Sequence, residues 1–306
     1  MKAALIVATT ELLRVVPSAM AAAVARAAGT GCWLLLTARR RTLLENLTYT
    51  APHATPAERQ RLAHATFRHL TLSVLDLLRG PHLSAEHVRA MIQVDGRSHL
   101  DAAIAAGRGV VLVSPHLGAI ELGGRCMSAF GYTMAVYAED ADDARLRAVY
   151  RRYRAIDGVV VLPLGSSALN GVRWLRRGGT LTLLADRAIG TRAHVVRFCG
   201  GRRPLPAGVA ALARQTGAAV LFSYLVREPG WRSSYRWVIE PPPSEDLAAL
   251  EEPVFTQVVA DRLSAMVRRH PDQWLVFQPE WQTDGPGQRP GGSDTASSRG
   301  VATIEP

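Results

Sequence analysis

The chain has 306 residues, 48% of them hydrophobic, which is enough for one large α/β domain or two small ones. The net charge is +10, with Lys2 as the single lysine among 36 basic residues, and this favours anionic partners such as phospholipid headgroups or phosphate-bearing substrates. Three widely spaced cysteines, and the lack of any recognisable zinc-finger, RNP-type or helix-turn-helix pattern, argue against a disulfide framework, a metal cluster and nucleic-acid binding.

The first forty residues are apolar but interrupted. Glu11 and Arg14 break the first apolar run, and the second ends at Arg39. No stretch reaches about 18 uncharged apolar residues, so neither a clean transmembrane helix nor a signal peptide is predicted. Two interpretations stay open: a pair of amphipathic or re-entrant helices lying on a membrane, with Trp33 at the interface, or an ordinary buried helical hairpin.

A helical segment leads from there to the first strands. Thr55, Pro56 and Glu58 form a helix-start signal, and the apolar period predicts a helix over 59–79. Short helices at 84–91 and 96–106 flank an expected strand at 92–94.

The sequence is organised around the stretch that follows, VVLVSPHLGAIELGG. Val110–Val113 is predicted to be a buried strand, Pro115 ends it, and a helix is expected from Leu117 with Glu121 near its first turn. His116 would then lie at the carboxyl end of a strand, where chemistry is usual in open α/β sheets. An imidazole exchanges protons near neutral pH, and a carboxylate beside it orients the ring. The alternative is that His116 merely ends a strand and Glu121 is solvated.

The middle of the chain alternates predicted strands and helices, which indicates an α/β fold with a mostly parallel central sheet flanked by helices. Asp186 and Arg187 directly follow the strand predicted at 180–185. Arg152 and Arg154 lie on a charged helix, which is either a solvated face or a place that holds a phosphate. The strands are predicted at 132–137, 159–162, 180–185 and 218–226, and the helices at 142–155, 168–177 and 209–216.

The end of the chain completes the domain. An edge strand is predicted at 235–239, an amphipathic helix at 246–269 and a strand or loop at 275–278. The composition beyond Gln282 predicts a disordered tail. The expected organisation is therefore a membrane-associated helical segment at 1–40, an α/β domain at 41–281 and a tail at 282–306.

The order of several segments resembles the bacterial lysophospholipid-acyltransferase-like family, in the branch of lipid A late acyltransferases and phosphatidylinositol mannoside acyltransferases. The segments are RTLLENL, GRGVVLVSPHLGAIELGG, GGTLTLLADRAIG, RFCGGRRPLPAGVAALARQTGA and HPDQWLVFQPEW. The chain departs from the family pattern at Ala119 and Ile120, where many members have Asn-Trp. It also departs at Arg187 and Ala188, where an Asp-x-Asp exit is common, and at Cys199.

The resemblance implies acyl transfer from acyl-CoA or an acyl carrier protein to a hydroxyl group of an anionic lipid or glycolipid, with no cofactor and no metal. His116 would act as the general base and Glu121 would orient it, while the amides of Leu117 and Gly118 are candidates for holding the oxyanion. The expected location is the cytoplasmic face of the bacterial cell membrane, with the enzyme peripheral or shallowly inserted.

Other predicted roles concern the substrates. Asp186 is expected to hold an arginine or the acceptor. A guanidinium grips phosphate through two hydrogen bonds, which makes several arginines candidates for substrate binding. These arginines are Arg152, Arg154 and Arg187.

Three other functions are alternatives to this one. An acyltransferase of the same fold could tailor a secondary metabolite, and a protein without catalysis could bind anionic lipids. A serine hydrolase would need a Gly-x-Ser-x-Gly elbow, and Gly165, Ser166 and Ser167 lack the second glycine.

Overall fold

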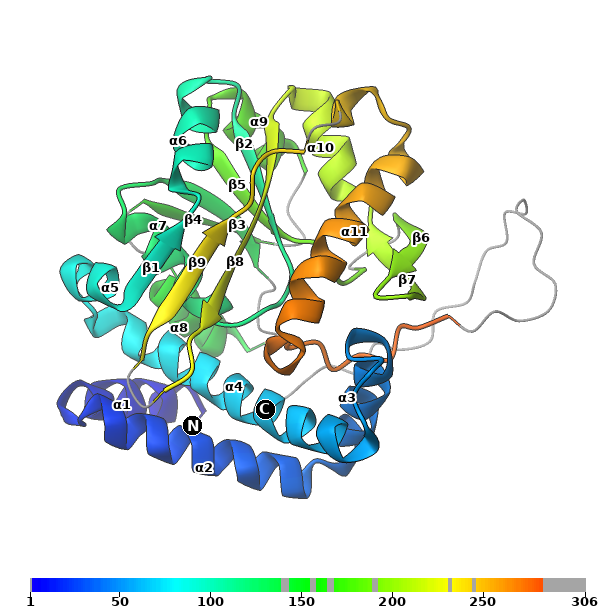
Figure 1. The fold of residues 1–306 in the computed structure, drawn as a ribbon. Helices are drawn as coiled ribbons and strands as arrows, with labels where there is room; N and C mark the ends of the chain where they lie inside the picture. Colours follow the sequence, from blue (N-terminus) through cyan, green and yellow to red (C-terminus); the bar gives the residue numbers. More distant parts are fainter. Residues whose placement is uncertain are drawn as a thin grey trace.

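The architecture is an open α/β sheet with helices on both faces (Figure 1). The structure is a computed structural model that describes residues 2–138, 143–154, 158–163, 168–188, 192–230, 233–243 and 246–282. The main sheet has the strand order β1-β9-β8-β2-β5-β3-β4, and β6 and β7 form a separate antiparallel hairpin. Neighbours in the main sheet are parallel except for β8 and β9, so the predicted fold class is confirmed.

The strands and helices alternate along most of the chain. The strands are β1 (Ile92–Asp95), β2 (Val110–Ser114), β3 (Met134–Ala138), β4 (Val159–Pro163), β5 (Thr180–Leu184), β6 (Ala193–Phe198), β7 (Gly201–Pro206), β8 (Ala219–Arg227) and β9 (Tyr235–Ile239). The α-helices are α1 (Lys2–Val15), α2 (Ser18–Leu35), α3 (Thr37–Thr50), α4 (Pro56–Arg79), α5 (Ala85–Met91), α6 (Arg97–Ala105), α7 (Gly123–Ala129), α8 (Ala144–Arg154), α9 (Leu169–Arg176), α10 (Gly208–Thr216) and α11 (Glu252–Arg269). Short 3-10 turns are η1 (Gly80–His82), η2 (Ile120–Leu122), η3 (Leu247–Ala249) and η4 (Pro271–Gln273).

Strand β2 lies in the middle of the sheet, and both of its faces are buried. Val111 and Val113 belong to the core that α9, α10 and α11 cover, whereas Val110 and Leu112 belong to the core under α5, α6 and α7. Burial on both faces explains why this strand is a continuous apolar run and not an alternating one.

Three predictions about individual elements were wrong. The strand at 235–239 exists, but it is not an edge strand, because β1 pairs with its outer side. The helix expected from Leu117 begins only at Gly123, after the 3-10 turn η2 that carries Glu121. The last long helix begins at Glu252 and not at 246, with Pro253 in its first turn.

The predicted start of α4 is confirmed in detail. The Thr55 hydroxyl accepts a hydrogen bond from the Glu58 amide at 3.3 Å, and the Glu58 carboxylate accepts one from the Thr55 amide at 2.7 Å. This reciprocal capping box satisfies two amides that the helix itself leaves unpaired.

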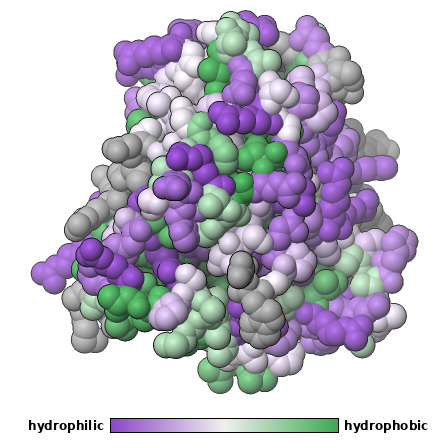
Figure 2. Space-filling model, turned by 60° about the vertical axis from the view of Figure 1, so that its left-hand side comes forward, coloured by the Kyte–Doolittle hydropathy of each residue, from purple (hydrophilic) through white to green (hydrophobic). Residues whose placement is uncertain are grey.

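The amino-terminal helices pack on α4 along one side. The buried side of α2 consists of Ala21, Ala22, Ala25 and Gly29, while Leu35 on the same helix is 80% exposed. In the described part of the chain no single helix is long and apolar enough to cross a membrane, although α2 and α3, bent by 94°, pass such a test together. Figure 2 shows apolar side chains along the lower edge of the molecule, where α1 and α2 lie in Figure 1. Burial on one side only does not fit a helical hairpin enclosed in the core.

Gly118 shapes the turn that follows β2. Its φ of +70° lies in the left-handed region, and a Cβ atom there would overlap the carbonyl oxygen of Leu225. The Gly118 amide donates to the Gln273 carbonyl, and the Ala119 amide donates to the Leu225 carbonyl. These contacts hold residues 118–119 against Gln273 and Leu225, so the helix begins only at Gly123.

We expect Gly118→Ala to lower the free energy of unfolding by about 2 kcal/mol or more, because alanine is strained at positive φ and the neighbouring backbone has to move. The thermal midpoint would fall by roughly 5 °C. The matched control is Gly123→Ala, since Gly123 is helical and a Cβ atom there meets nothing within 4 Å. Equal midpoints for the two variants would contradict this account of the turn.

Candidate functional site

His116 and Asp186 are brought together by the register of two parallel strands. In that register Ser114 at the end of β2 lies beside Leu184 at the end of β5. Two residues further along each chain, His116 and Asp186 therefore lie at the same edge of the sheet. The carboxyl ends of parallel strands are the usual place for a binding or catalytic site in such folds.

The two side chains are directly hydrogen-bonded. Nδ1 of His116 lies 2.5 Å from Oδ1 of Asp186, and the His116 amide donates to Oδ2 at 2.8 Å. The indole Nε1 of Trp274 also donates to Oδ2, at 2.7 Å. Asp186 is fully buried, whereas 13% of the His116 side chain is exposed. The carboxylate favours the tautomer with the proton on Nδ1, which leaves Nε2 as the nitrogen that can accept a proton.

The charge of Asp186 is stabilised by its neighbours. Burial alone would raise the pKa of this carboxyl group, but the charge of His116 and the hydrogen bonds from His116 and Trp274 outweigh it. The net shift of the Asp186 pKa is downward. The arrangement therefore places a carboxylate whose pKa is lowered on one nitrogen of an imidazole, which is the arrangement that a general base uses.

The buried side chain of Arg203 packs against the ring of Trp274. The guanidinium of Arg203 lies 5.4 Å from the centre of the Trp274 ring and 5.2 Å from that of Trp281. Its Nη2 donates to Glu280 at 2.8 Å, and the Arg203 side chain has no exposed surface. Stacking on both rings fixes Trp274, and so fixes the indole that holds Asp186.

The same aromatic group is tied to α3. The Asn46 amide donates to the Val276 carbonyl at 2.8 Å, and the indole of Trp281 donates to the Asn46 oxygen at 2.7 Å. The ring of Tyr49 stacks on Trp281 with centroids 4.0 Å apart. Through these contacts the amino-terminal helices support the site.

The predicted site residues are only partly brought together. Glu121 lies half-buried in η2, and among the described residues the carboxylate on Nδ1 of His116 is that of Asp186. Both oxygens of Asp186 are used by His116 and Trp274, which differs from the expected role of holding an arginine or the acceptor. Whether Glu121 also orients the ring stays a prediction.

The other candidates lie around this pair. The amides of Leu117 and Gly118 donate to the carbonyls of Pro115 and Gln273, so in this structure both are already used by the backbone. Arg187 follows Asp186, and within the described residues its buried Nε has no hydrogen-bond partner. The backbones of Arg152 and Arg154 lie in α8, and their side chains are outside the described part of the structure.

Several supporting residues were missed by sequence reasoning. Trp274, Arg203 and Asn46 belong to segments that carry the family resemblance, but nothing in their local pattern assigned a role to them. Their contacts join residues that are more than 70 positions apart, which local periodicity does not report. The described residues contain no group of three or more His, Cys, Asp or Glu side chains suited to a metal ion.

Comparison with known proteins gives a consistent result. The family model described as bacterial lipid A biosynthesis acyltransferase matches residues 2–283. Over 195 residues the chain is 31% identical to the phosphatidylinositol mannoside acyltransferase of Mycobacterium tuberculosis (strain ATCC 25618 / H37Rv). This alignment covers 62% of this chain and 60% of that protein. The corresponding Mycolicibacterium smegmatis protein is 28% identical over 216 residues, 68% of each chain. The lipid A biosynthesis palmitoleoyltransferase of Escherichia coli is 25% identical over 252 residues, 80% of this chain and 79% of that protein.

The lowered pKa of Asp186 gives a testable dependence of stability on pH. A carboxyl group with a lower pKa in the folded chain contributes stability above its ordinary pKa of about 3.8, and this contribution is lost as the pH falls through the folded value. We expect wild type to exceed Asp186→Asn in free energy of unfolding at neutral pH, and the difference to narrow below roughly pH 4. Urea unfolding of both proteins across this range measures it. A difference that stays constant over the whole range would show that Asp186 carries no stabilised charge.

Proposed function

We propose that this chain, which belongs to the bacterial lipid A biosynthesis acyltransferase family, transfers a fatty acyl chain from an acyl thioester to a hydroxyl group of an anionic lipid. The family resemblance predicted from the motifs is confirmed by the match over residues 2–283. The observation that carries the proposed chemistry is the hydrogen bond between His116 and Asp186 at the carboxyl edge of the sheet. The relatives are named as a phosphatidylinositol mannoside acyltransferase and a lipid A biosynthesis palmitoleoyltransferase. These names support a lipid acceptor.

In the proposed reaction the imidazole of His116 accepts one proton and later donates it. Nε2 of His116 takes the proton of the acceptor hydroxyl, and the oxygen attacks the thioester carbonyl to form a tetrahedral intermediate. The intermediate collapses with loss of the thiolate, which receives the proton from the imidazolium. Asp186 stabilises the imidazolium during this exchange and holds the ring through Nδ1.

The roles of the remaining candidates extend this mechanism. Glu121 is proposed to help orient His116 or the acceptor hydroxyl from the turn η2. Arg187 is proposed to bind a phosphate of the donor or acceptor, because its buried Nε has no partner among the described residues. Arg152 and Arg154 keep the same proposed role. The donor is acyl-CoA or an acyl carrier protein, and the proposed location is the cytoplasmic membrane face.

The first test removes the base. We expect His116→Ala to lower acceptor-dependent release of free thiol from palmitoyl-CoA by about 10³-fold, because the acceptor hydroxyl then has no general base. Membrane lipid extract serves as the acceptor, and mass spectrometry identifies the acylated product. His87→Ala is the control, since His87 is exposed on α5 and its side chain makes no contact with the site. Equal thiol release by wild type and His116→Ala would sink the mechanism.

A second test separates the two carboxylates. We expect Asp186→Asn to lower kcat by about 10³-fold, since an amide on Nδ1 favours the wrong tautomer. Glu121→Gln should cost less, because Glu121 does not hold Nδ1. The control is Glu252→Gln, which changes a carboxylate that lies 2.9 Å from Nε2 of His194, away from His116. A larger loss of kcat in Glu121→Gln than in Asp186→Asn would reverse this assignment.

A further inference from the structure

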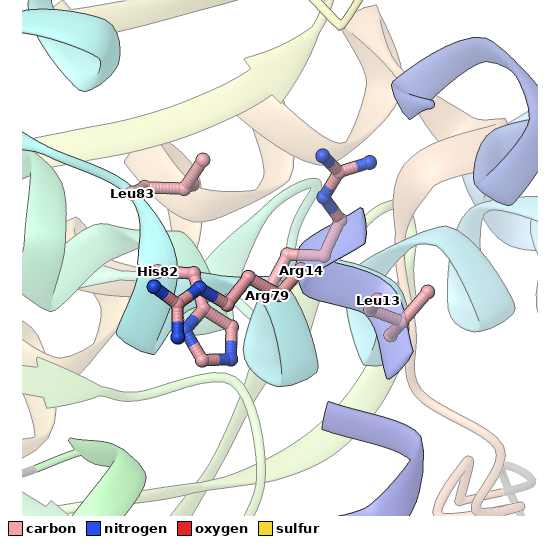
Figure 3. Close-up of a pocket in the computed structure, with 5 residues that line it drawn as sticks. All are labelled: Leu13, Arg14, Arg79, His82 and Leu83. Carbon is pink, nitrogen blue, oxygen red and sulfur yellow. The ribbon is translucent and has the colours of Figure 1, made fainter. Parts of the chain in front are cut away.

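A hollow of about 430 Å³ lies between the last turn of α1 and the turn that follows α4. Figure 3 shows its lining, with the guanidinium of Arg79 beside the ring of His82 and the side chain of Arg14 extending from α1 in another direction. The lining includes none of the residues that contact His116 or Asp186. The lining residues are Leu13, Arg14, Arg79, His82 and Leu83.

The walls of the hollow are fixed by hydrogen bonds between elements. Nε2 of His82 lies 3.1 Å from the carbonyl oxygen of Thr10, which joins the turn η1 to α1. On the other side, Nη1 of Arg125 donates to the Leu83 carbonyl at 3.1 Å. Thr10 is itself buried. The hollow is therefore part of the fold, and Arg125 adds a further positive charge beside it.

The lining of the hollow is basic, and the charge of Arg79 also acts on the carboxylate of Asp76. The lining contains two arginines and a histidine but no acid. Neither Arg14 nor Arg79 has a hydrogen bond or ion pair with any residue that the structure describes. Asp76, one turn before Arg79, is buried and accepts hydrogen bonds from Arg227 and Tyr235. Two guanidinium groups facing one hollow favour a phosphate as the ligand, because each can donate two parallel hydrogen bonds.

Exposed apolar side chains occur on the same helix as Arg14 and on α2. Leu12 and Val15 flank Arg14 on α1 and are 61% and 76% exposed. Met20 and Val24 on the adjacent α2 are also exposed. A free phosphate ion would gain nothing from exposed apolar side chains, whereas a lipid offers both a phosphate and acyl chains.

We propose that this hollow binds the phosphate of an anionic membrane phospholipid, through Arg14 and Arg79, at a place separate from the reaction site. The bound lipid is held and not acylated, so this inference goes beyond the proposed function. It gives α1 and the end of α4 a defined headgroup contact with the bilayer. Anionic surfaces attract each arginine near them, and two such contacts correspond to roughly tenfold or more in affinity.

The test measures vesicle binding by the full chain, without any acyl donor. The probe is a phosphatidylcholine vesicle containing phosphatidylinositol, compared with phosphatidylcholine alone. We expect the double variant Arg14→Gln/Arg79→Gln to bind the anionic vesicles roughly tenfold more weakly than wild type. The control variant Arg177→Gln/Arg214→Gln loses the same charge at exposed residues after α9 and on α10, and it should bind as wild type does.

Three further results decide between the sources of the ligand. Short-chain phosphatidylinositol should displace the protein from the vesicles at a lower concentration than glycerophosphoinositol does. If the two compounds displace it at the same concentration, the ligand is a soluble phosphate and the proposal of a lipid is wrong. Equal losses in the two double variants would show that net charge, and not the hollow, drives binding. Vesicle binding that is kept by Arg14→Gln/Arg79→Gln, together with lost binding of an acyl carrier protein, would make the hollow a protein-docking site and overturn the proposal.

Failure of this inference is distinguishable from failure of the proposed function. His116→Ala should bind anionic vesicles as wild type does, since His116 does not line the hollow. Arg14→Gln/Arg79→Gln should keep thiol release from palmitoyl-CoA when donor and acceptor are presented in neutral detergent. Loss of that activity would place the hollow in the reaction site and overturn its separate role. An unchanged thermal midpoint confirms that the variant is folded.

Discussion

The burial of the Asp186 charge is the constraint on which the rest of the site depends. A carboxylate without exposed surface is costly unless donors replace the lost water. Here the donors are the His116 amide, the His116 ring and the Trp274 indole, which come from separate parts of the chain. The imidazole of His116 is thus held by the same interactions that stabilise the buried charge, so stability and positioning are not independent properties of this fold.

The support of the site continues outward from Trp274. Arg203 lies over the rings of Trp274 and Trp281 and pairs with Glu280, and the indole of Trp281 donates to Asn46 on α3. Helix α3 is therefore linked to the sheet edge that carries His116 by a short series of contacts. The amino-terminal helices and the residues around Asp186 all lie within the stretch, residues 2–283, that the family model matches.

The sequence reveals the elements better than their arrangement. The run Val110–Val113 identifies a strand buried on both faces, and Thr55 with Glu58 identifies the start of α4. The meeting of His116 with Asp186 was not predictable, because it depends on β5 being the neighbour of β2. The strand at 235–239 was predicted to be an edge strand, but β1 pairs with it, and Arg236 pairs with Asp95 and Glu228.

The distance along the chain between the parts of the site has a consequence for biosynthesis. Trp274 lies 88 positions after Asp186, and the amide of Leu275 donates to the carbonyl of His116 itself. While the strands β2 and β5 are already outside the ribosome, this segment is still to be translated. The growing chain therefore displays its amino-terminal helices long before the ring of His116 is fully held.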